Sequence, residues 1–359
     1  MVTKYREIDY KPGISGQADK QPDKPKDKPK EQKNSLLEDP KAFKEYSFHK
    51  EEHYLIDKTV LTHEKEIFFN IYTLEKLKFI PIVEAAKNRP AKIDKQLLAS
   101  SGDFVIKKSD IPLYQDYLHS LAELSDPSEG SRVKAIIVRE NSKLIMKELL
   151  DHPRSGEKIK ESKIMVNNMV DCILKNKDAL HDLLSLRNYD YYTYAHSVNV
   201  AVLSIGLGAA IDLKRDDVEK LGTGALLHDI GKSVISPEVL NKQGKLSDTE
   251  YTIMKNHVIE GEKILRTHKE VPDESFDAVL QHHEKLTGKG YPMKLSGKEI
   301  KPFGRITAIS DCYDAMTTRR PYKPAFTPFN ALSIIAKEAS DYDPELLKVF
   351  IKMLGKMQE

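Results

Sequence analysis

The stretch DDVEKLGTGALLHDIG, residues 216–231, decides the fold of this chain. Its apolar residues recur at intervals of three and four, as on one face of a helix, and the apolar run GALL ends on the pair His228 and Asp229. An ionisable side chain is costly to bury unless it has a partner or a metal. A histidine and an aspartate at the end of a buried helix therefore indicate a polar site in the core of a helical domain.

Helical spacing extends from this stretch in both directions. Beyond residue 131, strand-like alternation is scarce, and apolar residues at i, i+3, i+4 and i+7 predict one helix after another. We expect an all-α bundle whose chemistry lies between its helices. The segments with this pattern are 133–150, 163–176, 195–210, 216–231, 248–265, 275–284, 306–318 and 330–339.

The N-terminal third has another pattern. Residues 11–34 interleave Lys, Asp and Pro with almost no bulky apolar side chains, so they cannot bury enough surface to fold. Residues 64–83 alternate and are rich in Ile, Phe, Val and Tyr, residues 103–110 form a second extended candidate, and residues 111–125 have helical spacing. These segments predict a small α+β module behind a disordered tail.

Proline and glycine in SDPSEGS, residues 125–131, mark a plausible boundary. The predicted fold class is therefore mainly α, with a small α+β module ahead of an all-α bundle. We divide the chain into a disordered tail at 1–37, an α+β regulatory module at 38–125 and a helical catalytic domain at 126–359.

Composition excludes several classes of protein. A net charge of +2 over 359 residues argues against a protein that coats DNA. Two distant cysteines, Cys172 and Cys312, suggest neither a disulfide framework nor a thiolate zinc site. The weakly polar run at 198–211 is shorter than the about 20 residues of a membrane span, and the N-terminus lacks the apolar core of a signal peptide. We expect a cytoplasmic protein with no membrane segment.

A group of histidines and aspartates could converge in the bundle. Imidazole and carboxylate donors without thiolates suit divalent metals such as Fe, Mn, Co, Ni or Zn, and a carboxylate can bridge two cations. Seven such groups exceed what one metal normally needs, so a binuclear site would accommodate them best. The candidate ligands are His196, His228, Asp229, His257, His282, His283 and Asp311.

Four ordered motifs carry a specific resemblance. HDIGK at 228–232, HHE at 282–284, GKGYP at 288–292 and DCYDAMTTRRPYK at 311–323 are similar to those of the HD-GYP family. That family comprises bacterial cyclic di-GMP phosphodiesterases within the HD metal-dependent phosphohydrolases. The similarity covers about residues 185–345.

The resemblance implies how the ligands divide between two metals. A subset of the family adds a third metal through a glutamate four residues before the first histidine, where this chain has Tyr192, so two are predicted. We expect both ions to be Fe or Mn, and Ni, Co and Zn also suit the donors. The first metal would be held by His196, His228, Asp229 and Asp311, and the second by His257, His282 and His283, with Asp229 as the bridge.

Such a centre has a defined chemistry. Two metals about 3.5 to 4 Å apart polarise a phosphoryl oxygen and lower the pKa of a bridging water, which then attacks in line as hydroxide. Asp229, as the bridge, is one predicted catalytic residue. The resemblance makes Lys232 the other, as a point charge that binds the phosphate.

The GKGYP loop is the predicted wall of the substrate site. Glycines at 288 and 290 allow positive φ and close approach of the backbone to a ligand, Pro292 stiffens the exit, and Tyr291 offers a ring and a hydroxyl to the dinucleotide. The other predicted substrate contacts are Lys232, then Arg320 and Lys323 for the second phosphate, and Asp190 for a base.

Two residues depart from the family pattern. Thr287 stands where aspartate is usual before the first loop glycine, and Val258 follows His257 where proline is common. Neither is a predicted metal ligand, so the departures bear on loop geometry and substrate affinity.

The resemblance implies a signalling phosphodiesterase that hydrolyses cyclic di-GMP to pGpG and onward to GMP. One alternative is a regulatory module that binds a cyclic dinucleotide or docks on a diguanylate cyclase with weak or no catalysis. Another is a hydrolase of a different cyclic dinucleotide, such as cyclic GMP-AMP. Helix 132–150 could pair two copies of the chain in a homodimer.

Overall fold

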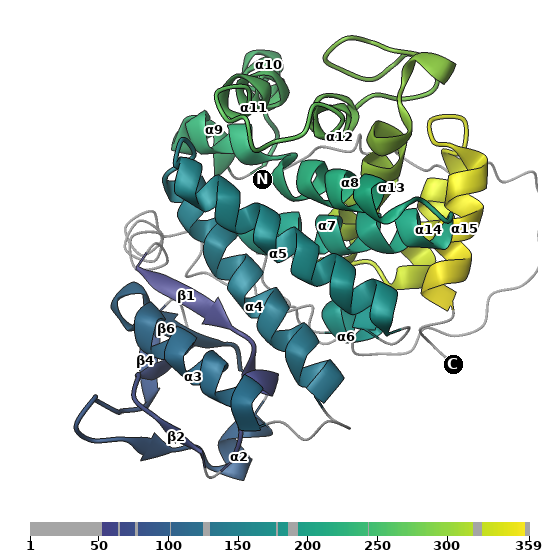
Figure 1. Ribbon diagram of the computed structural model, residues 1–359. Helices are drawn as coiled ribbons and strands as arrows, with labels where there is room; N and C mark the ends of the chain where they lie inside the picture. Colours follow the sequence, from purple (N-terminus) through teal and green to yellow (C-terminus); the bar gives the residue numbers. More distant parts are fainter. Residues whose placement is uncertain are drawn as a thin grey trace, which may run out of the picture.

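The computed structural model describes residues 52–63, 65–75, 78–100, 102–124, 130–176, 179–185, 193–242, 244–318 and 325–355. A small sheet-containing module lies against a larger assembly of helices (Figure 1). The predicted fold class, an α+β module followed by an all-α bundle, is confirmed. The tail predicted at 1–37 and residues 125–129 of the predicted boundary lie outside the described residues, so the domain limits remain a prediction.

The N-terminal module is built on an antiparallel sheet in the order β1-β6-β3-β4. The alternating segment 64–83 contains the strands β2, β3 and β4, as its pattern predicts, and β3 pairs with β4. One face of the sheet packs on α3, which buries Tyr114 and Leu118 in the shared core. The strands are β1 (His53–Ile56), β2 (Glu66–Ile67), β3 (Ile71–Glu75), β4 (Lys78–Val83), β5 (Ala91–Lys92) and β6 (Phe104–Lys107), and the helices are η2 (Lys58–Val60), α2 (Lys95–Leu98), η3 (Lys108–Asp110) and α3 (Ile111–Leu124).

The bundle begins with α4, the long helix that lies between the module and the remaining helices (Figure 1). Its first half consists of α4 (Gly130–Asp151), α5 (Gly156–Lys175), α6 (Ala179–Ser185), α7 (Thr193–Ala210), α8 (Arg215–Leu227) and η4 (Ile230–Val234). Its second half consists of α9 (Pro237–Leu240), α10 (Asp248–Lys255), α11 (His257–Leu265), α12 (Ser275–Gln281), η5 (Gly297–Glu299), α13 (Pro302–Thr317), α14 (Pro328–Lys337) and α15 (Pro344–Gly355).

Helix α7 is the centre of the bundle. It is buried on nearly every face: Tyr194 is buried, and so is every residue from His196 to Gly208. The helices α4, α8, α13 and α15 pack around it. A polar side chain on α7 therefore enters the interior, and His196 lies in its first turn.

The segment 248–265, predicted as helical, forms two helices instead of one. Helix α10 ends at Lys255 and α11 begins at His257, with Asn256 between them. The backbone N–H of Asn256 bonds to Ile253 three residues back, which tightens the turn. This break sets His257 at the start of a helix.

Within the described residues, no helix combines the length and the apolar character that crossing a bilayer requires.

Candidate metal centre

His228 and Asp229 lie where one helix ends and another type of helix begins. Helix α8 stops at Leu227, and η4 starts at Ile230. Both side chains are fully buried. The change of backbone at this junction presents two adjacent side chains to the interior, which a continuous helix, with about 100° between neighbours, would separate.

Three histidines share one local arrangement. In each, Nδ1 donates to a backbone carbonyl three residues earlier, which leaves Nε2 as the unprotonated nitrogen. The N···O distances are 2.7 Å from His228 to Ala225, 2.7 Å from His257 to Met254 and 2.8 Å from His282 to Val279. Each ring is thereby fixed with an Nε2 lone pair directed away from its own helix.

The two oxygens of Asp229 face different histidines. Oδ2 lies 3.2 Å from Nε2 of His228 and 3.7 Å from Nε2 of His196. Oδ1 lies 3.3 Å from Nε2 of His257 and 3.9 Å from Nε2 of His282. Asp229 therefore stands between two pairs of imidazoles, one pair for each oxygen.

Asp311 on α13 completes the cluster. Its Oδ1 lies 3.0 Å from Nε2 of His196, and its Oδ2 lies 3.8 Å from Nδ1 of His283. The structure thus brings together all seven predicted ligands. They form two groups in which the donor atoms lie within 4.8 Å of one another, His196 with His228 and Asp311, and Asp229 with His257, His282 and His283.

Most of the imidazoles are neutral. Burial lowers the pKa of His257 to about 3 and that of His283 to about 4, and it holds the pKa of His282 well below its ordinary value. His196 is the exception. Burial opposes its charge, but hydrogen bonds to Asp311 and Asp314 outweigh that effect and raise the pKa of His196 to about 9.

Both acids of the cluster are ionised. Burial opposes the charge of Asp229, but its interactions with His228 and Lys232 hold its pKa well below the ordinary value. Burial also opposes the charge of Asp311, but the hydrogen bond from His196 outweighs it and lowers the pKa of Asp311 below its ordinary value. Carboxylates and neutral imidazoles are the protonation states in which these groups bind metals.

The atoms of the cluster fit cations. The Nε2 atoms of His257 and His282 are 3.3 Å apart, and because each ring donates through Nδ1, two lone pairs face each other. Among the described residues, Nε2 of His228, Nε2 of His283 and Oδ1 of Asp229 are buried with no hydrogen-bond partner. Buried acceptors of this kind need a positive charge between them.

Lys232 is buried in the same cluster. Only 1% of its surface is exposed, and its Nζ forms an ion pair with Oδ2 of Asp229. The lysine therefore lies beside the predicted bridging carboxylate, in the interior of the bundle.

Two polar residues of the centre escaped the sequence reasoning. Asp314 accepts a 2.8 Å hydrogen bond from Nδ1 of His196 and a 3.1 Å bond from Nδ2 of Asn199. Each lies three residues after a predicted ligand, Asp314 after Asp311 and Asn199 after His196. That i, i+3 spacing on a helix was the signal that could have found them.

The GKGYP loop lies against His283. The ring of Tyr291 is 4.6 Å from that of His283, and the Tyr291 N–H donates to the His283 carbonyl at 3.2 Å. The peptide bond from Tyr291 to Pro292 is cis. Gly288 has a φ of +73°, as the sequence predicts, but Gly290 is needed for another reason: a Cβ there would lie 2.4 Å from Cα of Glu284.

Glu284 and Thr287 anchor this loop from behind. The Glu284 carboxylate accepts hydrogen bonds from the N–H of Met293 at 2.7 Å and of Leu295 at 3.0 Å. Thr287, one of the two departures from the family pattern, donates through Oγ1 to Asp341 at 2.6 Å. The threonine thus ties the loop to the turn before α15.

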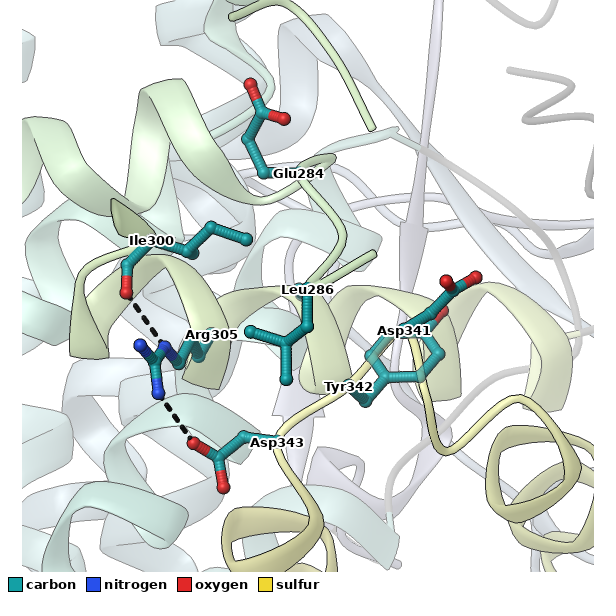
Figure 2. A pocket seen from close by; sticks show the side chains of 8 residues that line it. Glu284, Leu286, Ile300, Arg305, Asp341, Tyr342 and Asp343 are labelled. Carbon is teal, nitrogen blue, oxygen red and sulfur yellow. Dashed lines mark hydrogen bonds and ion pairs between the residues drawn. The ribbon is translucent and has the colours of Figure 1, made fainter. Parts of the chain in front are cut away.

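A small cavity lies behind the loop. Figure 2 shows Arg305 between Ile300 and Asp343, bonded to the carbonyl of the first at 2.8 Å and to the carboxylate of the second at 2.9 Å. The cavity measures about 10 Å³, room for one water molecule and far too little for a dinucleotide. It belongs to the packing that holds the loop.

The second departure is compatible with its position. Val258 is the second residue of α11 and is fully buried. Proline is tolerated at the start of a helix because the N–H there has no intrahelical partner, so valine fits equally well and supplies apolar packing. Asp190, Tyr192, Arg320 and Lys323 lie outside the described residues.

Comparisons with known proteins agree with this geometry. The HD domain family matches residues 178–346. A cyclic di-GMP phosphodiesterase of Pseudomonas aeruginosa is 33% identical over 63% of this chain and 53% of its own length. A 3'3'-cGAMP-specific phosphodiesterase of Vibrio cholerae is 32% identical over 52% of this chain and 36% of its own length. The chain thus spans about half or less of these two relatives.

One solved structure has the same fold over most of the chain. An HDG"Y"P protein from Bdellovibrio bacteriovorus has a TM-score of 0.65 and 21% identity, and the match covers 84% of this chain and 99% of that one. The family match, the relatives and the converged ligands agree with the four motifs of the sequence. Residues 178–346, which carry the metal centre, match the HD domain family, and the motifs within them resemble those of the HD-GYP group.

Proposed function

We propose that this chain is a metal-dependent phosphodiesterase that hydrolyses cyclic di-GMP to pGpG and onward to GMP. The observation that carries the proposal is Asp229, whose two oxygens face two separate pairs of imidazole nitrogens. A carboxylate in this setting suits two cations, one on each side. The relatives named as cyclic di-GMP phosphodiesterases support the choice of substrate.

Seven side chains would hold two divalent ions, Fe or Mn, with Ni, Co and Zn as further candidates. When bound, such a pair polarises a phosphoryl oxygen and lowers the pKa of a water between the ions. One ion would be held by His196, His228, Asp229 and Asp311, and the other by Asp229, His257, His282 and His283.

The chain's own groups would orient the substrate. Lys232, beside Asp229, is a fixed positive charge for the phosphate and for the 3'-oxygen that leaves. The ring of Tyr291 lies against that of His283 at a tilt, and it would form the wall against which the dinucleotide rests. Arg320 and Lys323 for the second phosphate, and Asp190 for a base, remain predictions.

The direct test is hydrolysis of cyclic di-GMP by the protein loaded with Fe(II) or Mn(II) under reducing conditions. We expect pGpG as the first product. Failure of turnover with every divalent metal, together with tight binding of the nucleotide, would instead favour a binding module.

A second substrate follows from the relatives. Because a 3'3'-cGAMP-specific enzyme is 32% identical to this chain, cyclic GMP-AMP is the competing candidate. Turnover of an equimolar mixture measures the ratio of the two specificity constants. A ratio in favour of cyclic GMP-AMP would move the proposal to that nucleotide and leave the metal chemistry unchanged.

Glu284→Gln is expected to raise KM for the cyclic dinucleotide about tenfold and to leave Mn(II) affinity unchanged, because weakening two charge-assisted hydrogen bonds by about 1.4 kcal/mol in total loosens the loop. Steady-state kinetics and a metal titration on one sample measure both quantities. Glu299→Gln is the matched control, since Glu299 accepts from Ser296 on the exposed side of the same region. A fall in Mn(II) affinity in Glu284→Gln would contradict a role confined to the loop.

A further inference from the structure

A line of buried polar groups runs from the N-terminal module to the metal centre. Arg139 on α4 is 2% exposed, and its Nη2 donates to Oδ1 of Asn199 on α7 at 3.1 Å. Nδ2 of Asn199 donates to Oδ1 of Asp314 at 3.1 Å. The other oxygen of Asp314 accepts from Nδ1 of His196 at 2.8 Å. Three helices thus contribute to one continuous set of hydrogen bonds.

Arg139 decides which way the Asn199 amide points. A guanidinium only donates and a carboxylate only accepts. With Oδ1 toward Arg139 and Nδ2 toward Asp314, both contacts are favourable. Rotating the amide by 180° would set donor against donor and acceptor against acceptor. Without Arg139, only the contact of Nδ2 with Asp314 would orient the Asn199 amide.

Asp57 holds Arg139 from the module. Oδ2 of Asp57 lies 3.6 Å from Nη1 of Arg139, and both side chains are 2% exposed. Oδ1 of Asp57 accepts from the N–H and the hydroxyl of Thr59, which fixes the carboxylate at the start of η2. A buried guanidinium needs such a counter-charge. Asp57 follows β1, so this charge comes from the N-terminal module.

The module also buries the next polar residues of α4. Glu140 accepts a 2.8 Å hydrogen bond from the hydroxyl of Tyr114 on α3 and pairs with Lys143 at 2.5 Å. Nζ of Lys143 donates to the Leu55 carbonyl of β1 at 3.4 Å. The face of α4 that carries these charges is therefore desolvated only while the module is docked.

We propose that Asn199, oriented by Arg139, is a positioning residue of the metal centre, and that Asp57 makes this positioning depend on the docked N-terminal module. The inference rests on the proposed metal centre and names a route by which the module reaches it. Movement of β1 and η2 away from α4 would remove the counter-charge of Arg139. The Asn199 amide, the Asp314 carboxylate and the ring of His196 would then lose their fixed orientation in turn.

The experiment measures Mn(II) affinity of the whole chain by competition with a chromophoric chelator. Because partners behind a ligand typically contribute 10- to 100-fold to affinity, Asn199→Ala and Arg139→Met are each expected to weaken binding by about tenfold. The double variant is expected to bind Mn(II) no more weakly than Asn199→Ala alone, because Arg139 acts on the metal centre only through Asn199. If the losses of Mn(II) affinity in the two single variants added up in the double variant, Arg139 would not act through Asn199.

Asp57→Asn is the milder variant, because it keeps the shape of the side chain and Oδ1 for Thr59. It is expected to weaken Mn(II) binding severalfold. Ser142→Ala is the matched control: Ser142 is buried on the same helix but donates only within it, to Val138 at 2.6 Å. Equal affinity in Asp57→Asn and Ser142→Ala would remove the module from the proposal.

A second readout needs no metal and no nucleotide. In the metal-free protein, the Nδ1–H proton of His196 is expected at low field in the NMR spectrum because of its hydrogen bond to Asp314. Arg139→Met and Asn199→Ala should shift or broaden this signal, whereas Ser142→Ala should not. An unchanged signal in folded Arg139→Met would overturn the inference even if cyclic di-GMP is hydrolysed, and absence of hydrolysis would not affect this readout.

Discussion

Asp229→Asn is expected to lower turnover of cyclic di-GMP by about 1,000-fold or more, which corresponds to a loss of about 4 kcal/mol in transition-state stabilisation. The amide keeps the shape of the side chain but offers one oxygen where the carboxylate offers two. The amide therefore cannot offer an oxygen to a cation on each side of residue 229, where the two oxygens of Asp229 face different histidines. Steady-state kinetics and metal content per chain measure the two expected losses together.

The same substitution should also destabilise the fold. Lys232 is 1% exposed and pairs with Asp229, so Asp229→Asn leaves a buried ammonium without its counter-charge, at a cost of about 3 kcal/mol. The double variant Asp229→Asn/Lys232→Met is expected to recover the melting temperature while remaining inactive. That outcome separates the stability effect from the catalytic one.

A surface carboxylate provides the control for charge removal. Asp171 pairs with Lys175 at 3.0 Å and with Arg215, and exposed pairs contribute little to stability. Asp171→Asn should match the wild type in turnover and melting temperature. Retention of a tenth or more of wild-type turnover in Asp229→Asn, with Asp171→Asn unchanged, would show that the bridge is not required.

Gly231→Ala is expected to lower both stability and turnover, although it adds only one methyl group. A Cβ at this position would lie 1.9 Å from the carbonyl oxygen of His257 and 2.5 Å from the backbone N of Gly261. Both contacts are with the backbone of α11, so no side chain can rotate away. Helix α11 would have to move as a unit, and His257 is its first residue.

Two losses should accompany that movement. Overpacking of this kind typically costs 1–3 kcal/mol, and we expect about 3 kcal/mol here because backbone must shift. Displacing His257 by about 1 Å from Asp229 should lower turnover by about 100-fold. Differential scanning calorimetry measures the loss of stability, and steady-state kinetics measures the loss of turnover. Metal analysis should show less metal per chain, because the group that contains His257 would bind its ion more weakly.

Gly261→Ala is a close control. Gly261 faces Gly231 across the same contact, but a Cβ on it would have its nearest neighbour at 3.4 Å, an ordinary van der Waals distance. Alanine there also favours the helix. The control should be as stable as the wild type. If Gly231→Ala behaved like Gly261→Ala, the close approach of η4 to α11 would not be a requirement of the site.

These two predictions concern one short motif, HDIGK, in which four of the five residues each have a separate physical reason. His228 contributes a ring fixed by its own helix, Asp229 two oxygens that face different histidines, Gly231 the absence of a side chain, and Lys232 a buried charge. The sequence indicated the polar site but gave the glycine no role. Its requirement comes from α11, which follows 26 residues after Gly231, at His257.

The predicted elements and the structure differ at positions that apolar spacing does not describe. The strands within 64–83 and the helix at 111–125 follow local patterns, and both form as expected. The break at Asn256 interrupts a pattern that is helical throughout, and Gly290 is required by packing on Glu284 rather than by positive φ. Neither could be predicted from spacing, because the apolar pattern runs through Asn256 without interruption and the contact of Gly290 with Glu284 depends on how the loop folds back.

The sequence by itself determined the class of fold and the identity of the clustered groups, because apolar periodicity and the choice of donor atoms are local properties of the chain. Only the tertiary structure decided how those groups meet: Asp229 between two pairs of imidazoles, Lys232 in an ion pair within the core, and Asp57 opposite Arg139. Distances of a few ångströms between residues up to 118 positions apart, as in the contact of His196 with Asp314, depend on how helices pack. Packing depends on the surfaces of two helices together, so the apolar pattern of one segment does not determine it.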